Sequence, residues 1–360
     1  MYNSAKVTSI NIMKLLHGTV SRRHIQIALG CIWFLDGALQ LQHQMFTSAF
    51  ATQVIDPAAQ GQPVWVSGPI HFAVHVFLMH PAVFNSLIAV TQMGLGLLIL
   101  WKHSAKWGLW ASVLWGLFVW SIGEGYGGIF NGSASLIMGA PGAALLYALL
   151  ALACLPSSTK HGGKTDEKHT GKQPAAFWLV IVWALLWFGG MFWQLSTSGM
   201  NSVSDMKSMI LSNAQSAPRW LATTDTYVAE KMNSLGTYQQ PMSSGQSMNM
   251  MQMAQMPTKK GSADWFTPTL ATLMVFVSLG VFWRPFRKIS LALGIIISLF
   301  FWVVGQSLGS YYTGTATDPN TGPLIILLAI AIWGCTDLDA AMKKFIDKSE
   351  NVLVGVDRSS

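Results

Sequence analysis

The chain has 360 residues, of which 51% are hydrophobic and only 10% are charged, and its formal net charge is +7. A soluble domain has about 25% charged residues, so this composition excludes an ordinary soluble globular protein. A helix that spans a membrane needs about 20 mostly apolar residues, and the apolar residues of this chain come in blocks of about that length. We therefore predict an all-α polytopic membrane protein with the lipid bilayer as its main partner.

Eight apolar blocks are candidate membrane spans, at 24–42, 84–101, 108–125, 138–155, 175–195, 266–283, 289–308 and 322–335. Tryptophans stand at the ends of several blocks, as is common at a membrane interface: Trp101, Trp193, Trp265 and Trp283. The blocks group into two parallel four-helix repeats. The predicted order is an amino-terminal segment (1–23), a first repeat (24–155), a linker (156–174), a second repeat (175–335) with a Met-rich outer loop (236–264), and a tail (336–360).

Basic residues indicate the orientation of the spans. Of the 22 Lys and Arg residues, 17 lie in the amino-terminal segment, 102–107, the linker, 284–288 and the tail. Cytoplasmic loops carry the excess of positive charge, so both termini are predicted to be cytoplasmic, in the cell membrane. The net charge is explained by this topology, and we expect no nucleic-acid partner.

The two halves resemble each other in sequence. A gapless shift of 182 residues pairs Trp120 with Trp302, Gly127 with Gly309 and Pro141 with Pro323. A second register, with a shift of 154–155, pairs the starts of the halves. Four spans per half keep both halves in one orientation, so the repeats are predicted to be parallel rather than inverted.

Two acidic residues of the first half are missing from the second. Asp36 corresponds to Gly190 and Glu124 corresponds to Gln306. A carboxylate at membrane depth is costly and marks a candidate functional site. We predict Asp36 and Glu124 as catalytic residues at the outer leaflet; the alternative is that each only forms hydrogen bonds that fix helix register.

Four histidines of the first half are candidate metal ligands on the same outer side. Helices are expected in the outer loops, at about 69–80 and near 218–235, and the first would place His71 and His75 on one face. His43 and His80 lie at the ends of neighbouring spans. Imidazole with carboxylate suits copper, iron or zinc. The alternative is a set of interfacial histidines without a metal.

The second half has one feature that the first half lacks, a cluster of methionines in its outer loop. The candidate metal ligands there are Met248, Met250, Met251 and Met253, with Met242 and Met256 beside them. Thioethers are soft ligands that suit Cu(I). The alternative is a disordered linker in which methionine is incidental.

Residues 27–40 and 180–194, each ending in Gln, resemble the opening helix of the DoxX/DoxD-like membrane family, and the four-span unit is similar too. That family includes membrane subunits of thiosulfate:quinone oxidoreductase. The resemblance implies a quinone cofactor and redox partner subunits.

Three hypotheses follow from the sequence. The first is an oxidoreductase subunit, linked to a quinone or dependent on a metal, with its site at the outer leaflet of the first repeat. The second is a copper-handling membrane protein that binds and delivers Cu(I). The third is a non-catalytic structural subunit of a membrane complex.

Overall fold

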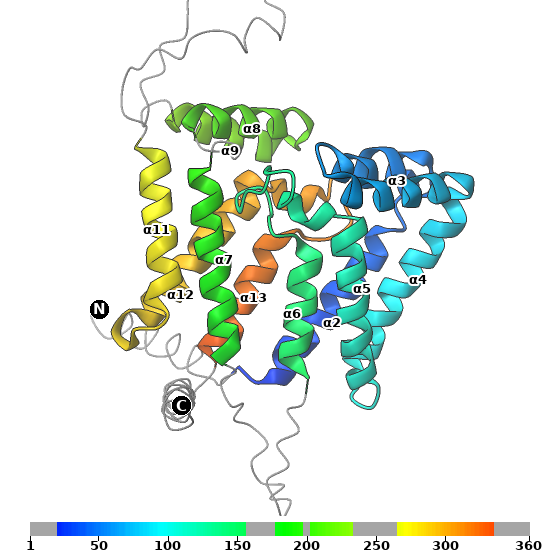
Figure 1. Ribbon diagram of the computed structural model, residues 1–360, viewed down its shortest axis with the longest axis horizontal. Coiled ribbons are helices and arrows are strands. Elements are labelled where there is room, and N and C mark those ends of the chain that lie inside the picture. The colour runs from blue at the N-terminus through cyan, green and yellow to red at the C-terminus, as the bar shows by residue number, and fades with distance from the viewer. Residues whose placement is uncertain (1–19, 156–176, 197–201, 233–264, 335–360) are drawn as a thin grey trace, which may run out of the picture.

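The computed structural model describes residues 20–155, 177–196, 202–232 and 265–334, and within these ranges every regular element is a helix (Figure 1). Most of the amino-terminal segment, the linker, the Met-rich loop and the tail lie outside the described residues. The all-helical class predicted from the sequence is confirmed for the described part.

Each apolar block predicted from the sequence contains one helix. In the first half these are α2 (Arg22–Leu39), α4 (Pro81–Leu100), α5 (Ala105–Ile122) and α6 (Ala143–Cys154). In the second half they are α7 (Phe177–Leu195), α11 (Phe266–Gly280), α12 (Arg284–Phe300) with its π-helical continuation η5 (Phe301–Gly305), and α13 (Thr321–Trp333). The main differences are α6, which begins five residues later than the predicted 138–155 block, and α12, which begins five residues earlier than the predicted 289–308 block.

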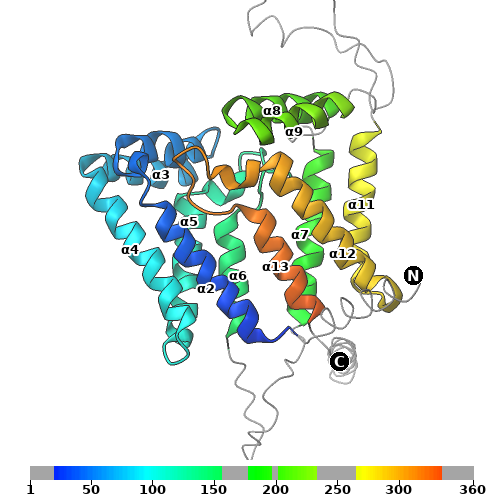
Figure 2. The same ribbon diagram turned by 180° about the vertical axis from the view of Figure 1, so that it is seen from behind.

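The helices of the two halves pack in the same pattern. Helix α2 contacts α4 and α6, as α7 contacts α11 and α13, and α5 packs on α6 as α12 packs on α13. The halves meet where α6 contacts α13, in the middle of the molecule (Figures 1 and 2).

Three further helices lie across one end of the upright helices: α3 (Val64–Met79), α8 (Val203–Ser216) and α9 (Arg219–Met232) (Figure 1). Helices α3 and α9 overlap the predicted outer-loop helices, and each follows a proline, Pro63 or Pro218; α3 begins five residues before the predicted 69–80 and contains Pro69. Helix α8 was not predicted. Its first turn is capped by Ser202, whose hydroxyl accepts a hydrogen bond from the Asp205 amide at 3.0 Å.

Within the described ranges, three helices are long and apolar enough to cross a membrane: α4, α7 and the continuous Arg284–Gly305 segment. Helices α3, α6, α11 and α13 are apolar but shorter. On α4 a row of large apolar side chains faces outward, and Val90 is 70% exposed and Leu87 58% exposed. Because exposing such side chains to water costs about 25 cal/mol per Å², this surface is compatible with a lipid environment.

The loop before the last helix of each half folds in a similar way. In the short 3₁₀ helices η4 (Gly125–Gly128) and η6 (Ser307–Ser310), Tyr126 and Leu308 both have positive φ angles, 59° and 55°. Trp120 Nε1 donates to the Pro141 carbonyl at 2.6 Å, and Trp302 Nε1 donates to the Pro319 carbonyl at 2.7 Å. The counterpart of Pro141 is therefore Pro319 and not Pro323, because the second loop is four residues shorter.

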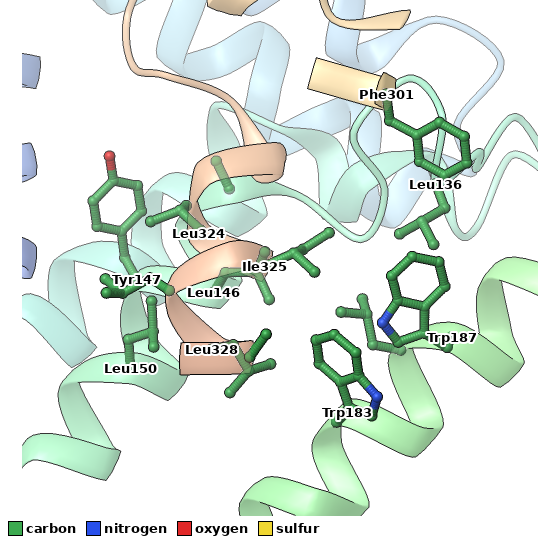
Figure 3. Packing of buried hydrophobic residues seen from close by; sticks show 14 of the residues in the cluster. Leu136, Leu146, Tyr147, Leu150, Trp183, Trp187, Phe301, Leu324, Ile325 and Leu328 are labelled. Atoms are coloured by element: carbon green, nitrogen blue, oxygen red, sulfur yellow. The ribbon is translucent and has the colours of Figure 1, made fainter. Parts of the chain in front are cut away.

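Each of these loops reaches over to the other half. Leu136, in the loop of the first half, lies between Phe301 and Trp187 of the second half (Figure 3). The segment before α13 extends toward the first half (Figure 2), where the Ala316 carbonyl accepts a hydrogen bond from Gln42 Nε2 at 3.0 Å. The environment of each first helix is therefore completed by residues of the other half.

Candidate functional site

A cavity of about 120 Å³ lies inside the first half, beside α2. Trp33, Asp36 and Gln40 line it from one side, because residues three and four apart share a face of a helix. Helix α4 contributes Gln92, and α6 contributes Tyr147. Helix α5 lines the cavity with Trp115, Phe118, Val119 and Ile122. Residues on or next to α2, α4, α5 and α6 thus line one cavity.

Asp36 is the most unusual residue of this cavity. The residue is only 1% exposed, and neither of its carboxylate oxygens has a hydrogen-bond partner within the described structure. The Tyr147 hydroxyl faces Asp36 and points away from the apolar cluster that surrounds the tyrosine ring (Figure 3), but the pair does not reach ordinary hydrogen-bond geometry. An unpaired buried polar group costs about 1–3 kcal/mol, so Asp36 is a group that a bound ligand would satisfy.

Glu124 lies two residues beyond the end of α5 and lines the same cavity. Its Oε1 accepts a hydrogen bond from the Ala144 amide at 3.0 Å, at the start of α6. Its Oε2 is buried and has no partner among the described residues. A Cβ atom at Gly142 would lie 2.2 Å from that Oε2, so glycine keeps the space for this oxygen open. The structure thus brings the two predicted catalytic residues to one cavity.

Asp318 is a third carboxyl group of the cavity, and it comes from the second half. It faces both Asp36 and Glu124, and its negative charge would repel theirs. Its own oxygens accept hydrogen bonds from the Thr317 hydroxyl at 2.6 Å and the Asn320 amide at 2.7 Å. Burial raises the pKa of Asp318, although both hydrogen bonds oppose that rise.

Asp318 and Tyr147 were not among the site residues predicted from the sequence, because acidic residues were compared only from the first half to the second and Tyr147 lies within an apolar block. With Pro319 as the counterpart of Pro141, Asp318 corresponds to Ala140. The same test that selected Asp36, an acid facing an apolar residue in the other half, would have selected Asp318 if it had been applied in both directions. The hydroxyl of Tyr147, within the apolar 138–155 block, was the available signal for that residue.

Aromatic and aliphatic side chains form most of the cavity wall. They are Trp33, Phe50, Trp115, Phe118, Val119 and Ile122, among others. The Trp33 and Tyr147 rings are in contact, with centroids 4.3 Å apart. Among the described residues, Trp115 Nε1 is a buried donor without a partner, the Tyr147 hydroxyl has none in ordinary hydrogen-bond geometry although it faces Asp36, and Gln40 Oε1 and Gln92 Oε1 are buried acceptors without one. An apolar cavity with a few convergent unpaired polar groups is typical of a small-molecule site.

The corresponding place in the second half is filled. Gly190 stands where the first half has Asp36, and a Cβ there would lie 2.6 Å from Leu136 Cδ2. Gln306 stands in place of Glu124, and both ends of its amide are used: Oε1 accepts from the Gly322 amide at 3.0 Å, and Nε2 donates to Thr321 Oγ1 at 3.0 Å. The described second half therefore has packing where the first half has unpaired polar groups.

The structure does not gather the four histidines around one point. His43, His71, His75 and His80 are all exposed, and His71 Nδ1 lies 3.2 Å from Asp56 Oδ1. Across residues 20–155, 177–196, 202–232 and 265–334, no group of three or more His, Cys, Asp and Glu side chains is arranged to hold a metal ion. Met248, Met250, Met251 and Met253 lie outside the described residues, so a copper site there stays a prediction.

Comparison with known protein families, with curated proteins and with solved structures finds no match to this chain. The candidate site therefore rests on its own geometry: three carboxyl groups, unpaired donors and acceptors, and aromatic walls around one small cavity.

Proposed function

We propose that the protein is a polytopic membrane protein, with eight spans in two parallel repeats and both termini cytoplasmic, whose first-half cavity binds the headgroup of a quinone. In this role the chain is the membrane subunit of a quinone-linked oxidoreductase. The observation that carries the proposal is the set of buried, unpaired polar atoms around Asp36 in a cavity with aromatic walls.

The polar atoms of the cavity suit a ligand that changes between acceptor and donor. A quinone presents two carbonyl acceptors, which Trp115 Nε1 and the Tyr147 hydroxyl could engage as donors. A quinol presents two hydroxyl groups, and the Asp36 carboxylate could accept hydrogen bonds from them. Each redox state of the ligand thus finds partners among groups that are otherwise unpaired, which avoids the cost of burying them alone.

The number of carboxyl groups suits the two protons of the reaction. Oxidation of a quinol to a quinone releases two protons and two electrons. Asp36 and Glu124 each have an unpaired oxygen on the cavity and can take up one proton each. In the opposite direction, the reduction of a quinone that the resemblance to the DoxX/DoxD-like family implies, the same two carboxyl groups each supply one proton and a redox partner subunit supplies the two electrons.

The size of the cavity suits a single ring. An apolar protein cavity of about 150 Å³ holds one benzene molecule. The cavity beside Asp36, at about 120 Å³, is close to that volume, and its walls offer the Trp33 and Phe118 rings for stacking. The alkyl tail of a quinone would then extend toward lipid.

The proposal is tested by equilibrium binding of a decyl-substituted benzoquinol, kept reduced under anaerobic conditions, to the purified full chain in nanodiscs. We expect saturable binding, with an affinity that falls at least tenfold in Asp36→Asn, because a hydrogen bond to a charged group contributes about 1.5–3 kcal/mol. The matched control is Asp56→Asn, which changes an exposed carboxylate and should bind normally.

Two results would overturn the proposal. One is binding to Asp36→Asn that equals binding to the wild type. The other is binding that grows linearly with lipid content and does not saturate, since that is partition into the bilayer rather than binding at a site.

A further inference from the structure

A second and larger hollow, which we call the outer cleft, opens next to the first-half cavity. Its volume is about 520 Å³, and it shares Glu124 and Asp318 with that cavity. Its other polar lining comes from the η4 loop and from neighbouring turns: Gln62, Asn131, Ser133, Ser135 and Asn320. Thus two carboxyl groups line the outer cleft, and Lys, Arg and His are absent from the described residues around it.

Three donors around the outer cleft are already used within the protein, whereas the Ser135 hydroxyl, which can donate or accept, has no partner among the described residues. Gln62 Nε2 donates to the Gly125 carbonyl at 2.8 Å, and Asn131 Nδ2 donates to the Gln60 carbonyl at 2.8 Å. The Ser133 hydroxyl donates to Asn131 Oδ1 at 2.7 Å. The hydrogen-bonding capacity that remains is therefore mainly that of acceptors.

Three buried oxygens of the outer cleft have no partner in the described structure. They are Glu124 Oε2, Gln62 Oε1 and Ser135 Oγ. Ser135 is only 5% exposed, so its hydroxyl cannot be satisfied by bulk solvent from the surface. Each unpaired buried acceptor favours a ligand that brings hydrogen-bond donors.

We propose that the outer cleft binds a small organic cation with N–H donors, such as a primary amine. The two carboxyl groups supply the opposite charge, and the unpaired oxygens accept the ligand's N–H groups. The volume fits a small molecule, since ligand sites usually measure about 300–1,000 Å³. The inference does not depend on the ligand of the first-half cavity.

Three probes of one length test the charge requirement: 1,4-diaminobutane, 1,4-butanediol and succinate. Calorimetric titration uses the full chain in nanodiscs of zwitterionic lipid, so that the bilayer itself does not attract the diamine. We expect the diamine to bind, the diol to bind at least tenfold more weakly, and succinate not to bind. Absence of diamine binding, or equal affinity for diol and diamine, would overturn the proposal.

Variants locate the binding. We expect Asp318→Asn and Ser135→Ala each to weaken diamine binding, Asp318→Asn by about tenfold or more and Ser135→Ala by less, because the first removes a charge and the second only a hydroxyl. Glu230→Gln, which changes an exposed carboxylate on α9, should have no effect. If Ser135→Ala and Asp318→Asn both bind the diamine as the wild type does, the ligand lies elsewhere and the proposal is wrong.

Asp36→Asn separates this inference from the proposed quinone site. Asp36 lines the first-half cavity and is not part of the outer cleft. The variant should therefore bind quinol at least tenfold more weakly and keep diamine binding. Loss of diamine binding in Asp36→Asn would contradict the separation of the two sites.

Discussion

The first helices of the two halves, α2 and α7, occupy corresponding places but have opposite surroundings. Asp36 on α2 faces a cavity and meets Asp318, which the other half contributes. Gly190 on α7 faces Leu136, which also comes from the other half. The same exchange of loops thus completes a polar cavity on one side and closes an apolar core on the other. The comparison indicates that the first half has the candidate site, and that the second half packs against it and supplies Asp318 to the cavity.

The largest effect on stability is expected when the side chain that fills the space in front of Gly190 is made smaller. Leu136→Ala should lower the free energy of unfolding by about 2–5 kcal/mol, because Leu136 is buried against Trp187 and Phe301 and its loss leaves a void. Reversible unfolding of the chain in mixed micelles measures this change. Quinone binding should persist in the folded variant, since Leu136 does not line the first-half cavity.

A double-mutant cycle sharpens the same comparison. Gly190→Ala alone should destabilise the protein by about 1–3 kcal/mol, because the new Cβ would lie 2.6 Å from Leu136 Cδ2. In the Leu136→Ala background the same substitution should cost much less, and the difference is the coupling between the two positions. Additive effects would show that Leu136 does not fill the space in front of Gly190.

A third expectation compares α3 with α9. Both helices follow a proline, and at the same position from their starts α3 has Ile70 and α9 has Asp225, each fully buried. Burial raises the pKa of Asp225 from 3.8 to about 6. The folded state therefore binds the proton more tightly than the unfolded state, and its stability should fall as pH rises from about 3.8 to about 6.

Asp225→Asn should remove this pH dependence. Above pH 6 the variant should be more stable than the wild type by roughly 1 kcal/mol, a value that allows for solvent screening near the surface of α9. Thermal unfolding of both proteins on either side of this pH range measures the effect, with Glu230→Gln on the same helix as control. Equal pH dependence in the two proteins would rule out Asp225 as its source.

The smallest effect is expected at an exposed pair of the first half. His71 and Asp56 lie 3.2 Å apart with side chains 61% and 43% exposed. Exposed ion pairs contribute about 0–1 kcal/mol, so Asp56→Asn should change the unfolding free energy by less than about 1 kcal/mol. A larger loss of stability, or a loss of bound metal on substitution of His71, would support the prediction that the histidines are metal ligands.

Much of the helical layout could be predicted from the sequence because long apolar blocks require helices. The segments 24–42 and 84–101 correspond closely to α2 and α4. Helix α8 was missed because its sequence is polar and amphipathic, and because its cap at Ser202 is a weak local signal. The start of α6 was misplaced because the apolar residues Leu136 to Met138 belong to a loop that packs against the other half.

The candidate site could be predicted only in part. Asp36 and Glu124 were selected because the other half lacks them, and both line the cavity. Asp318 was not selected because the comparison was made only from the first half to the second, and its place at the first-half cavity depends on a loop that crosses between the halves. A pairwise comparison of sequences cannot reveal such a crossing, because it aligns each residue with its counterpart rather than with its neighbour in space.

Photolabelling with an azidoquinone, followed by peptide mapping, tests the central claim most directly, because it asks which half binds the ligand. The account predicts saturable labelling of α2, α5 or α6 at residues that line the cavity, with competition by unlabelled quinol that is at least tenfold weaker in Asp36→Asn than in the wild type. Competed labelling of α7, α11 or α12 around Gly190 would contradict the account.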